Sequence, residues 1–182
     1  MRVLVVDESP ERAELLREAL VQAGHEVTAS LSSPVALLRT IDQLEPDVIV
    51  IDTESPSRDV LEHLVVMSQH TPRPVVMFAS DATPETIRAV VRAGVSAYVV
   101  DGLSKERIKS IIDVAVARFE DFQELRTELA DRKYIERAKG LLMKKHGIDE
   151  EAAYALLRKS AMDRKLKLVD VARELLMHRN SA

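Results

Sequence analysis

The fold is decided by residues 47–52, DVIVID, in which four branched apolar residues stand between two aspartates. A run this short and this apolar is typical of a strand buried on both faces, in the middle of a parallel sheet. Comparable runs occur before it at residues 3–6 and after it at residues 75–79 and 97–100. We therefore predict a sheet whose central strand ends at Asp52.

The segments between these runs have helical spacing and recognisable helix starts. A hydroxyl residue serves well as an N-cap, and proline is favoured at the first helical position. With a further strand at residues 26–30, five strands alternate with five helices. This pattern predicts an α/β fold with a doubly wound five-stranded parallel sheet over residues 1–117. The expected helix starts are Ser9-Pro10, Ser33-Pro34, Thr83-Pro84 and Ser104.

Acidic side chains follow two of the predicted strands. Asp7 and Glu8 come after the first strand, and Asp52 ends the central one. Ligands of such sheets bind at the carboxyl ends of the strands, where these acids are expected to meet. Three carboxylates suit Mg²⁺, which would neutralise charge as a phosphoryl group is transferred to Asp52. We predict a Mg²⁺ site formed by Asp7, Glu8 and Asp52.

The fifth helix is expected to continue well past the α/β domain. Residues 104–146 contain no proline and a single glycine, Gly140. The apolar positions are spaced by 4, 3, 4, 3 and 7 residues, as in a coiled coil. We predict that residues 118–131 form a helical linker that joins two copies into a parallel homodimer; the alternative is a helix that packs only on its own domain. The apolar positions are Ile108, Ile112, Ala115, Phe119, Phe122 and Leu129.

The last third of the chain, residues 132–182, reads as a small module of three helices. Gly147 is expected to end the first helix, and Asp149 to cap the second. The second helix would bury a stripe formed by Ala153, Leu156, Leu157 and Ser160, and the third a stripe formed by Leu168, Val171, Ala172, Leu175 and Leu176.

Charge is distributed unevenly along the chain. Residues 1–117 carry a net charge of −7, and residues 132–182 a net charge of +6. An acidic domain joined to a basic one suggests that only the second contacts a polyanion, although a solvated helical surface gives the same count. Tyr134 and Tyr154 are the only aromatic residues of the module, and we interpret Tyr154 as a core-edge residue. The residues that we expect to contact such a polyanion are Arg137, Lys139, Lys144, Arg158, Lys159, Arg164 and Lys165.

Two resemblances give these patterns a function. The blocks ERAKGLLMKKHG, EAAYALLRKSAM and KLVDVARELL, in that order, resemble the ANTAR domain of bacterial regulators. The resemblance implies binding to paired hairpin loops in leader RNA and transcription antitermination. Residues 1–117 resemble a response-regulator receiver domain, which implies that Asp7 and Glu8 bind metal, that Asp52 is the phosphoacceptor and that Tyr98 is the switch aromatic.

The receiver resemblance fails at two positions. Ala79 stands where receivers carry Ser or Thr, and Asp101-Gly102 where they carry Lys-Pro. Control by a sensor kinase through Asp52 therefore competes with a pseudo-receiver that a sensor protein holds inactive. The second mode is that of nitrate-assimilation antiterminators, which the whole arrangement resembles most.

Composition excludes several other classes. The chain has no cysteine, its five histidines lack ligand spacing, and no nucleophile–His–acid arrangement suggests an enzyme. No apolar run is long enough for a membrane helix and no signal peptide is visible, so we expect a cytoplasmic protein. Two rival functions stay open: a DNA-binding two-component transcriptional regulator, since three helices can form a helix-turn-helix, and a protein-interaction adaptor.

Overall fold

The computed structural model describes residues 1–100 and 107–177, apart from the side chain of Pro34. The chain forms two compact units, Met1–Asp121 and Phe122–Ala182, which are described separately. Three of the sequence predictions concern residues outside the described ranges: the cap at Ser104 and the departures at Asp101 and Gly102.

The first unit contains the predicted five-stranded parallel sheet, in the order β2-β1-β3-β4-β5. The central strand, β3, contains residues 48–52 of the DVIVID segment, and Val48 to Val50 are completely buried. The predicted fold class is confirmed, with the doubly wound strand order of a receiver. The strands are β1 (Arg2–Asp7), β2 (Glu26–Leu31), β3 (Val48–Thr53), β4 (Val75–Ala79) and β5 (Ala97–Val100).

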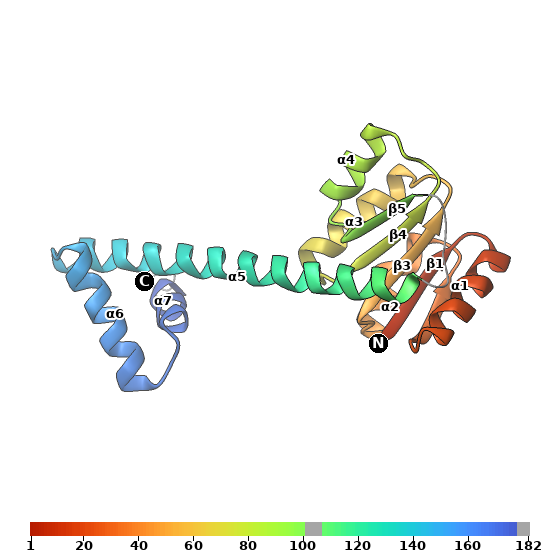
Figure 1. Ribbon diagram of the computed structural model, residues 1–182. Coiled ribbons are helices and arrows are strands. Elements are labelled where there is room, and N and C mark those ends of the chain that lie inside the picture. The colour runs from red at the N-terminus through yellow and green to blue at the C-terminus, as the bar shows by residue number, and fades with distance from the viewer. Residues whose placement is uncertain (101–106, 178–182) are drawn as a thin grey trace. The chain divides into compact units, whose positions relative to one another are not determined.

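Helices cover both faces of this sheet (Figure 1). On one face, α1 and the first turns of α5 pack against Val48 and Val50 of β3. On the other, the helices α2, α3 and α4 pack against Ile49 and Ile51. Alternate residues of one strand thus serve two cores, which is why the strand carries no polar residue before Asp52. The bounds are α1 (Pro10–Gln22), α2 (Leu37–Leu44), α3 (Arg58–His70), α4 (Pro84–Arg92) and α5 (Ile108–His146).

Two of the predicted cap-and-proline starts form as expected, and one differs. Ser9 accepts a hydrogen bond from the N–H of Arg12, and Thr83 from that of Thr86. At Ser33, the hydroxyl accepts from the N–H of Val35 instead. That contact closes a short 3₁₀ turn, η1 (Pro34–Ala36), and α2 begins only at Leu37.

The structure corrects the predicted coiled-coil seam in its first half. Ile108, Ile112 and Ala115 are completely buried in the sheet's own core and are not available to a second chain. Further along α5, Phe122 and Leu129 are each 61% exposed. The regularly spaced apolar residues of α5 therefore lie partly in the core of the first unit and partly on an exposed surface of the helix.

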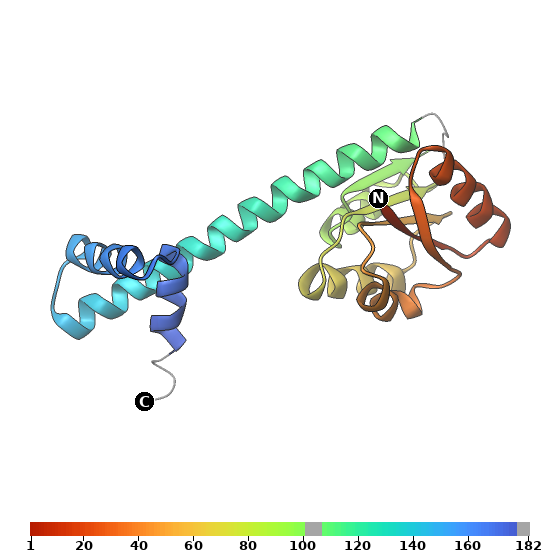
Figure 2. The ribbon, with the colours of Figure 1, turned by 90° about the horizontal axis from the view of Figure 1, so that it is seen from below.

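The second unit consists of the remainder of α5 with α6 (Glu150–Arg164) and α7 (Leu168–Met177), which pack against one another (Figure 2). Gly147 has a φ of +67° where α5 ends, and the Asp149 side chain accepts from the N–H of Ala152 at 2.8 Å. Both predictions are confirmed. The predicted buried position of Leu156 is wrong: this side chain is 46% exposed, and Ala161 is buried instead.

Small residues let the three helices of this unit approach closely. Ala138 of α5, Ala153 of α6 and Ala172 of α7 are all completely buried in one cluster. Leucines and valines surround the alanines, and all five residues of the stripe predicted for α7, Ala172 included, belong to this cluster. No helix among the described residues is long and apolar enough to cross a membrane.

Candidate functional site

Asp7 and Asp52 lie side by side at the carboxyl edge of the sheet. The register of β1 with β3 places them opposite each other, as the sequence predicted. Asp7 is buried and Asp52 is half-buried. Burial, followed by the neighbouring charge of Asp7, raises the pKa of Asp52. This edge therefore concentrates negative charge where water is scarce.

The third predicted metal ligand is placed differently. Glu8 is exposed, in contrast to the buried Asp7 beside it in the chain. Within residues 1–100 and 107–177, no group of three or more acidic, histidine or cysteine side chains is arranged to hold a metal ion. The Mg²⁺ site formed by Asp7, Glu8 and Asp52 stays a prediction.

A basic side chain that sequence reasoning missed lies at this edge. Arg12, in the first turn of α1, places its Nη2 atom 3.1 Å from Oδ1 of Asp7 and its Nε atom 3.4 Å from Oδ2. Its Nη1 atom lies 3.9 Å from a carboxylate oxygen of Glu54. Oδ1 of Asp7 also accepts from the N–H of Ser9 at 2.8 Å. Both oxygens of Asp7 are thus engaged within the chain.

The end of β4 lacks the hydroxyl of ordinary receivers. Ala79 is buried, Ser80 is exposed, and the backbone N–H groups of Ser80 and Asp81 both donate to the carbonyl of Glu54. The hydroxyl of Tyr98, the predicted switch residue, donates to the backbone carbonyl of Asp81. The two bonds to Glu54 hold the loops after β3 and β4 together, and the Tyr98 bond joins the second of these loops to β5.

The carboxylate of Asp81 is a second link between those loops. It accepts hydrogen bonds from the hydroxyls of Ser55 and Thr86, at 2.9 and 2.8 Å, and from the N–H of Thr83 at 2.9 Å. Led by the bond from the Thr83 N–H, these contacts lower the pKa of Asp81 to about 2. Five hydrogen bonds, counting those with Tyr98 and with the carbonyl of Glu54, make Asp81 the junction of the two loops.

We predict that Asp81→Asn destabilises the first unit near neutral pH and that the difference from wild type disappears in acid. The folded-state pKa of Asp81 is depressed from 3.8 to about 2, so its stabilisation is complete above the unfolded value and is lost as the pH falls toward 2. Urea denaturation at several pH values measures this. The exposed Asp42→Asn is the control, and a difference that does not change between pH 6 and pH 2.5 would contradict the assignment.

The predicted RNA-binding residues are exposed with one exception. Arg137, Lys144, Arg158, Lys159 and Lys165 are exposed, as is Arg164, whose guanidinium pairs with Glu174 of α7 at 2.6 Å. Lys139 is buried. Six of the seven predicted contacts are therefore accessible to RNA, whereas Lys139 is not exposed.

Lys139 joins α5 to α6. Its Nζ atom lies 2.8 Å from a carboxylate oxygen of Glu136, one turn earlier, and 2.6 Å from one of Glu150, in the first turn of α6. The hydrogen bonds that Lys139 donates to Glu136 and then to Glu150 raise the pKa of Lys139, and its side chain is only 9% exposed. RNA contact by Lys139 stays a prediction, while its geometry favours a role in holding the two helices together.

We predict that Lys139→Met lowers the thermal stability of the second unit. The substitution leaves Glu136 and Glu150 close together without their shared cation. Lys145→Met, at an exposed position of the same helix, removes the same charge and is the control. Thermal melts followed by circular dichroism should give a lower midpoint for Lys139→Met, and equal midpoints would show that the buried pairing contributes nothing.

The two tyrosines of this unit have different environments. Arg173 of α7 lies over the ring of Tyr134, 5.0 Å from its centre, and pairs with Asp131 at 2.7 Å. Tyr154 is 43% exposed and lines a shallow depression on α6 with Arg158, Lys159 and Met162 among its neighbours. The interpretation of Tyr154 as a core-edge residue is wrong, since its ring lies outside the buried cluster.

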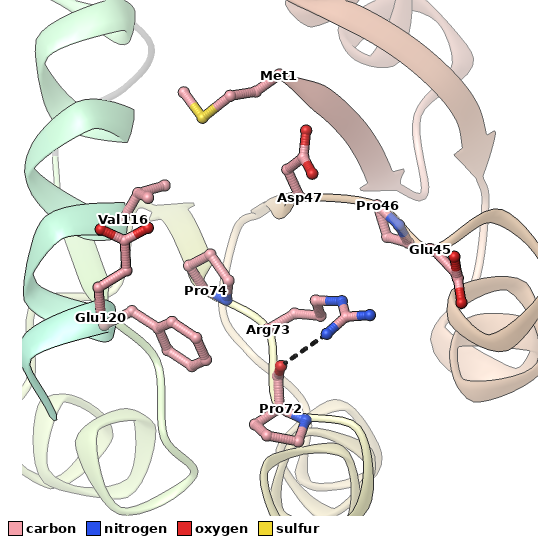
Figure 3. Close-up of a pocket in the computed structure, with 10 residues that line it drawn as sticks. Met1, Glu45, Pro46, Asp47, Pro72, Arg73, Pro74, Val116 and Glu120 are labelled. Atoms are coloured by element: carbon pink, nitrogen blue, oxygen red, sulfur yellow. Dashed lines mark hydrogen bonds between the residues drawn. The ribbon is translucent and has the colours of Figure 1, made fainter. Parts of the chain in front are cut away.

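A separate groove of about 540 Å³ opens at the opposite edge of the sheet from Asp52 (Figure 3). Met1, Asp47 and Pro74 line it just before β1, β3 and β4 begin, and Val116 and Glu120 of α5 face them. None of the predicted metal-binding, switch or RNA-binding residues lies in this groove, but Phe119 of the predicted coiled-coil positions lines it.

Comparison with known proteins agrees with this geometry. Residues 3–113 match the response regulator receiver domain. The chain belongs to the response regulators. Residues 123–176 match the ANTAR domain, so the receiver is followed by an ANTAR unit. The boundary between the two matches falls within α5, close to the division between the compact units.

Two relatives illustrate how far each resemblance extends. The transcriptional regulatory protein PdtaR of Mycobacterium tuberculosis is 28% identical over 182 residues, covering 96% of this chain and 89% of the relative. A protein-glutamate methylesterase of Xanthomonas oryzae is 38% identical over 109 residues, 59% of this chain but only 30% of the relative. The methylesterase match is confined to the receiver, whereas the PdtaR match spans both units.

Solved structures agree on the fold of the receiver. The signal receiver domain of NarL from Mycobacterium tuberculosis has a TM-score of 0.56 at 23% identity and covers 63% of this chain and 94% of that one. A pilus assembly-related protein of Burkholderia pseudomallei has a TM-score of 0.59 at 22% identity, covering 65% and 90%. The nitrate-assimilation subtype is not confirmed by any of these comparisons.

Proposed function

We propose that this response regulator is a transcription antitermination protein that binds paired hairpin loops in leader RNA through its ANTAR unit. The observation that carries the proposal is the succession of a receiver and an ANTAR unit within one chain, aligned along nearly its whole length with a transcriptional regulator. The alternative of a DNA-binding regulator is not favoured, because the ANTAR match includes all three helices of the second unit.

The exposed cations of the ANTAR unit form the proposed RNA-binding surface. Arg158 and Lys159 lie next to the exposed ring of Tyr154 on α6, while Arg137 and Lys144 project from α5. Lysine and arginine neutralise phosphates, and an aromatic ring can stack on a base splayed out of a loop. Tyr154 and its basic neighbours thus supply the two kinds of contact that a hairpin loop needs.

We predict that the double substitution Arg158→Gln and Lys159→Gln weakens RNA binding by the full chain and flattens its salt dependence. Each lost phosphate contact reduces the slope of log K against log salt by roughly 0.7 to 0.9. The substitutions Arg88→Gln and Arg92→Gln remove the same charge from the exposed surface of the receiver and are the control.

Filter binding to an RNA with two hairpins, across a salt series, measures both effects. A double variant on α6 that binds like the α4 control would exclude this part of the surface.

We further propose that the chain forms a parallel homodimer through α5. Phe122, Leu125 and Leu129 are spaced by three and four residues and are 59–61% exposed, an arrangement that places them along one side of the helix. A second copy would cover this apolar stripe and bring two ANTAR units to a paired target. The second binding event would then profit from a high effective concentration.

We predict that Phe122→Asp converts the dimer into monomers, because a charge at the seam would have to be buried without a partner. Thr127→Asp, at an exposed position on a different side of α5, adds the same charge outside the stripe and should leave the dimer intact. Sedimentation equilibrium distinguishes the two variants. Monomers in the unsubstituted chain at all concentrations, or dimers in both variants, would rule out this seam.

Control of the receiver is open to two partners. A sensor kinase would phosphorylate Asp52, with Asp7, Glu8 and Asp52 as the expected Mg²⁺ ligands; a sequestering sensor protein would instead bind the receiver surface. The side chain of Ala79 offers no hydroxyl to a phosphoryl group, and Asp7 is already paired with Arg12. Both observations favour the sensor protein.

A further inference from the structure

The ion pair between Arg12 and Asp7 has a consequence for metal binding. The side chain of Asp7 is completely inaccessible to solvent, whereas that of Arg12 is 39% exposed. The guanidinium contacts both oxygens of Asp7 from the solvent side, in the two-pronged geometry that arginine forms with carboxylates. The charge of the guanidinium is permanent, because arginine is not deprotonated in proteins.

The other acids at this edge also stabilise the charge of the guanidinium. Its pKa is raised first by its hydrogen bond to Asp7, and the charges of Asp52 and Glu54 act in the same direction. Arg12 therefore balances the negative charge collected where β1 and β3 end.

Receivers generally bind Mg²⁺ at this position. The residues of this chain, as arranged, do not fit the ion. Mg²⁺ requires several oxygen ligands in near-octahedral geometry, but Asp7 has committed both oxygens to Arg12 and Ser9, and Glu8 is exposed. An ion beside Asp7 and Asp52 would also lie next to a fixed positive charge.

We propose that Arg12 is the resident cation of this pocket: its guanidinium takes the place of a divalent ion beside Asp7 and Asp52, and Mg²⁺ binds there only by displacing it. This inference concerns the receiver alone and holds whether or not the ANTAR unit binds RNA.

The test is a calorimetric titration of the full chain with MgCl₂. Wild type should bind weakly or not measurably, and Arg12→Gln should bind about tenfold more tightly or better, a coupling of ordinary size for two competing cations. Arg17→Gln, which removes an exposed arginine paired with Glu14 on the same helix, is the control and should bind like wild type. Equal Mg²⁺ affinity in wild type and Arg12→Gln would overturn the proposal.

A second measurement covers the case in which the substitution destabilises the chain. Arg12→Gln leaves the buried Asp7 carboxylate without its cation, so the thermal midpoint of the variant should fall in the absence of Mg²⁺ and recover as Mg²⁺ is added. Wild type and Arg17→Gln should show no such recovery. Arg12→Lys keeps the charge but loses the two-pronged contact, and its Mg²⁺ affinity should lie between those of wild type and Arg12→Gln. A destabilised Arg12→Gln that Mg²⁺ does not restore would contradict the exchange of one cation for the other.

Discussion

Burial of β3 on both faces is the constraint from which the organisation of the receiver follows. A strand with helices on each side can carry polar groups only at its ends, so the first acid, Asp52, comes where the strand emerges. Parallel pairing with β1 brings Asp7 to the same point. The sheet thus creates a concentration of negative charge that needs compensation, and Arg12 supplies it from the helix that follows β1.

In the ANTAR unit, a charged side chain is likewise paired with opposite charges, at the junction of α5 and α6. Its core is built around four buried alanines, which bring the helices close together and leave little room for long side chains. Lys139 lies at the edge of this core and is held by Glu136 and Glu150. With that cation used internally, the remaining predicted cations are directed outward, where a polyanion can reach them.

The sequence predicted features that depend on periodicity and on local backbone chemistry. The five strands, the caps at Ser9, Thr83 and Asp149, and the adjacency of Asp7 and Asp52 all follow from short patterns and from the geometry of parallel sheets. The apolar stripe of α7 could also be predicted, because its apolar residues recur at regular helical spacing.

The features that the sequence did not reveal depend on pairing across space. Nothing local distinguishes Arg12 from Arg17, the other basic residue of α1, because the partner of Arg12 belongs to the preceding strand. The sequence predicts Lys139 as an RNA contact, because its partner Glu150 lies eleven residues away on the next helix and the pairing cannot be read from local spacing. The spacing along α5 predicts one coiled-coil stripe that contains both Ile112 and Phe122. Periodicity alone does not show whether an apolar face packs on its own sheet or is exposed to solvent.

The central claim is that RNA is the polymer that the basic unit binds. Filter binding of the full chain to a two-hairpin leader RNA and to duplex DNA of equal length, over the same range of salt concentrations, tests this directly. We expect tighter binding to the RNA at every salt concentration, with a steep loss of affinity as salt rises. Equal or tighter binding to the duplex, or no binding to the hairpins even at low salt, would contradict the account.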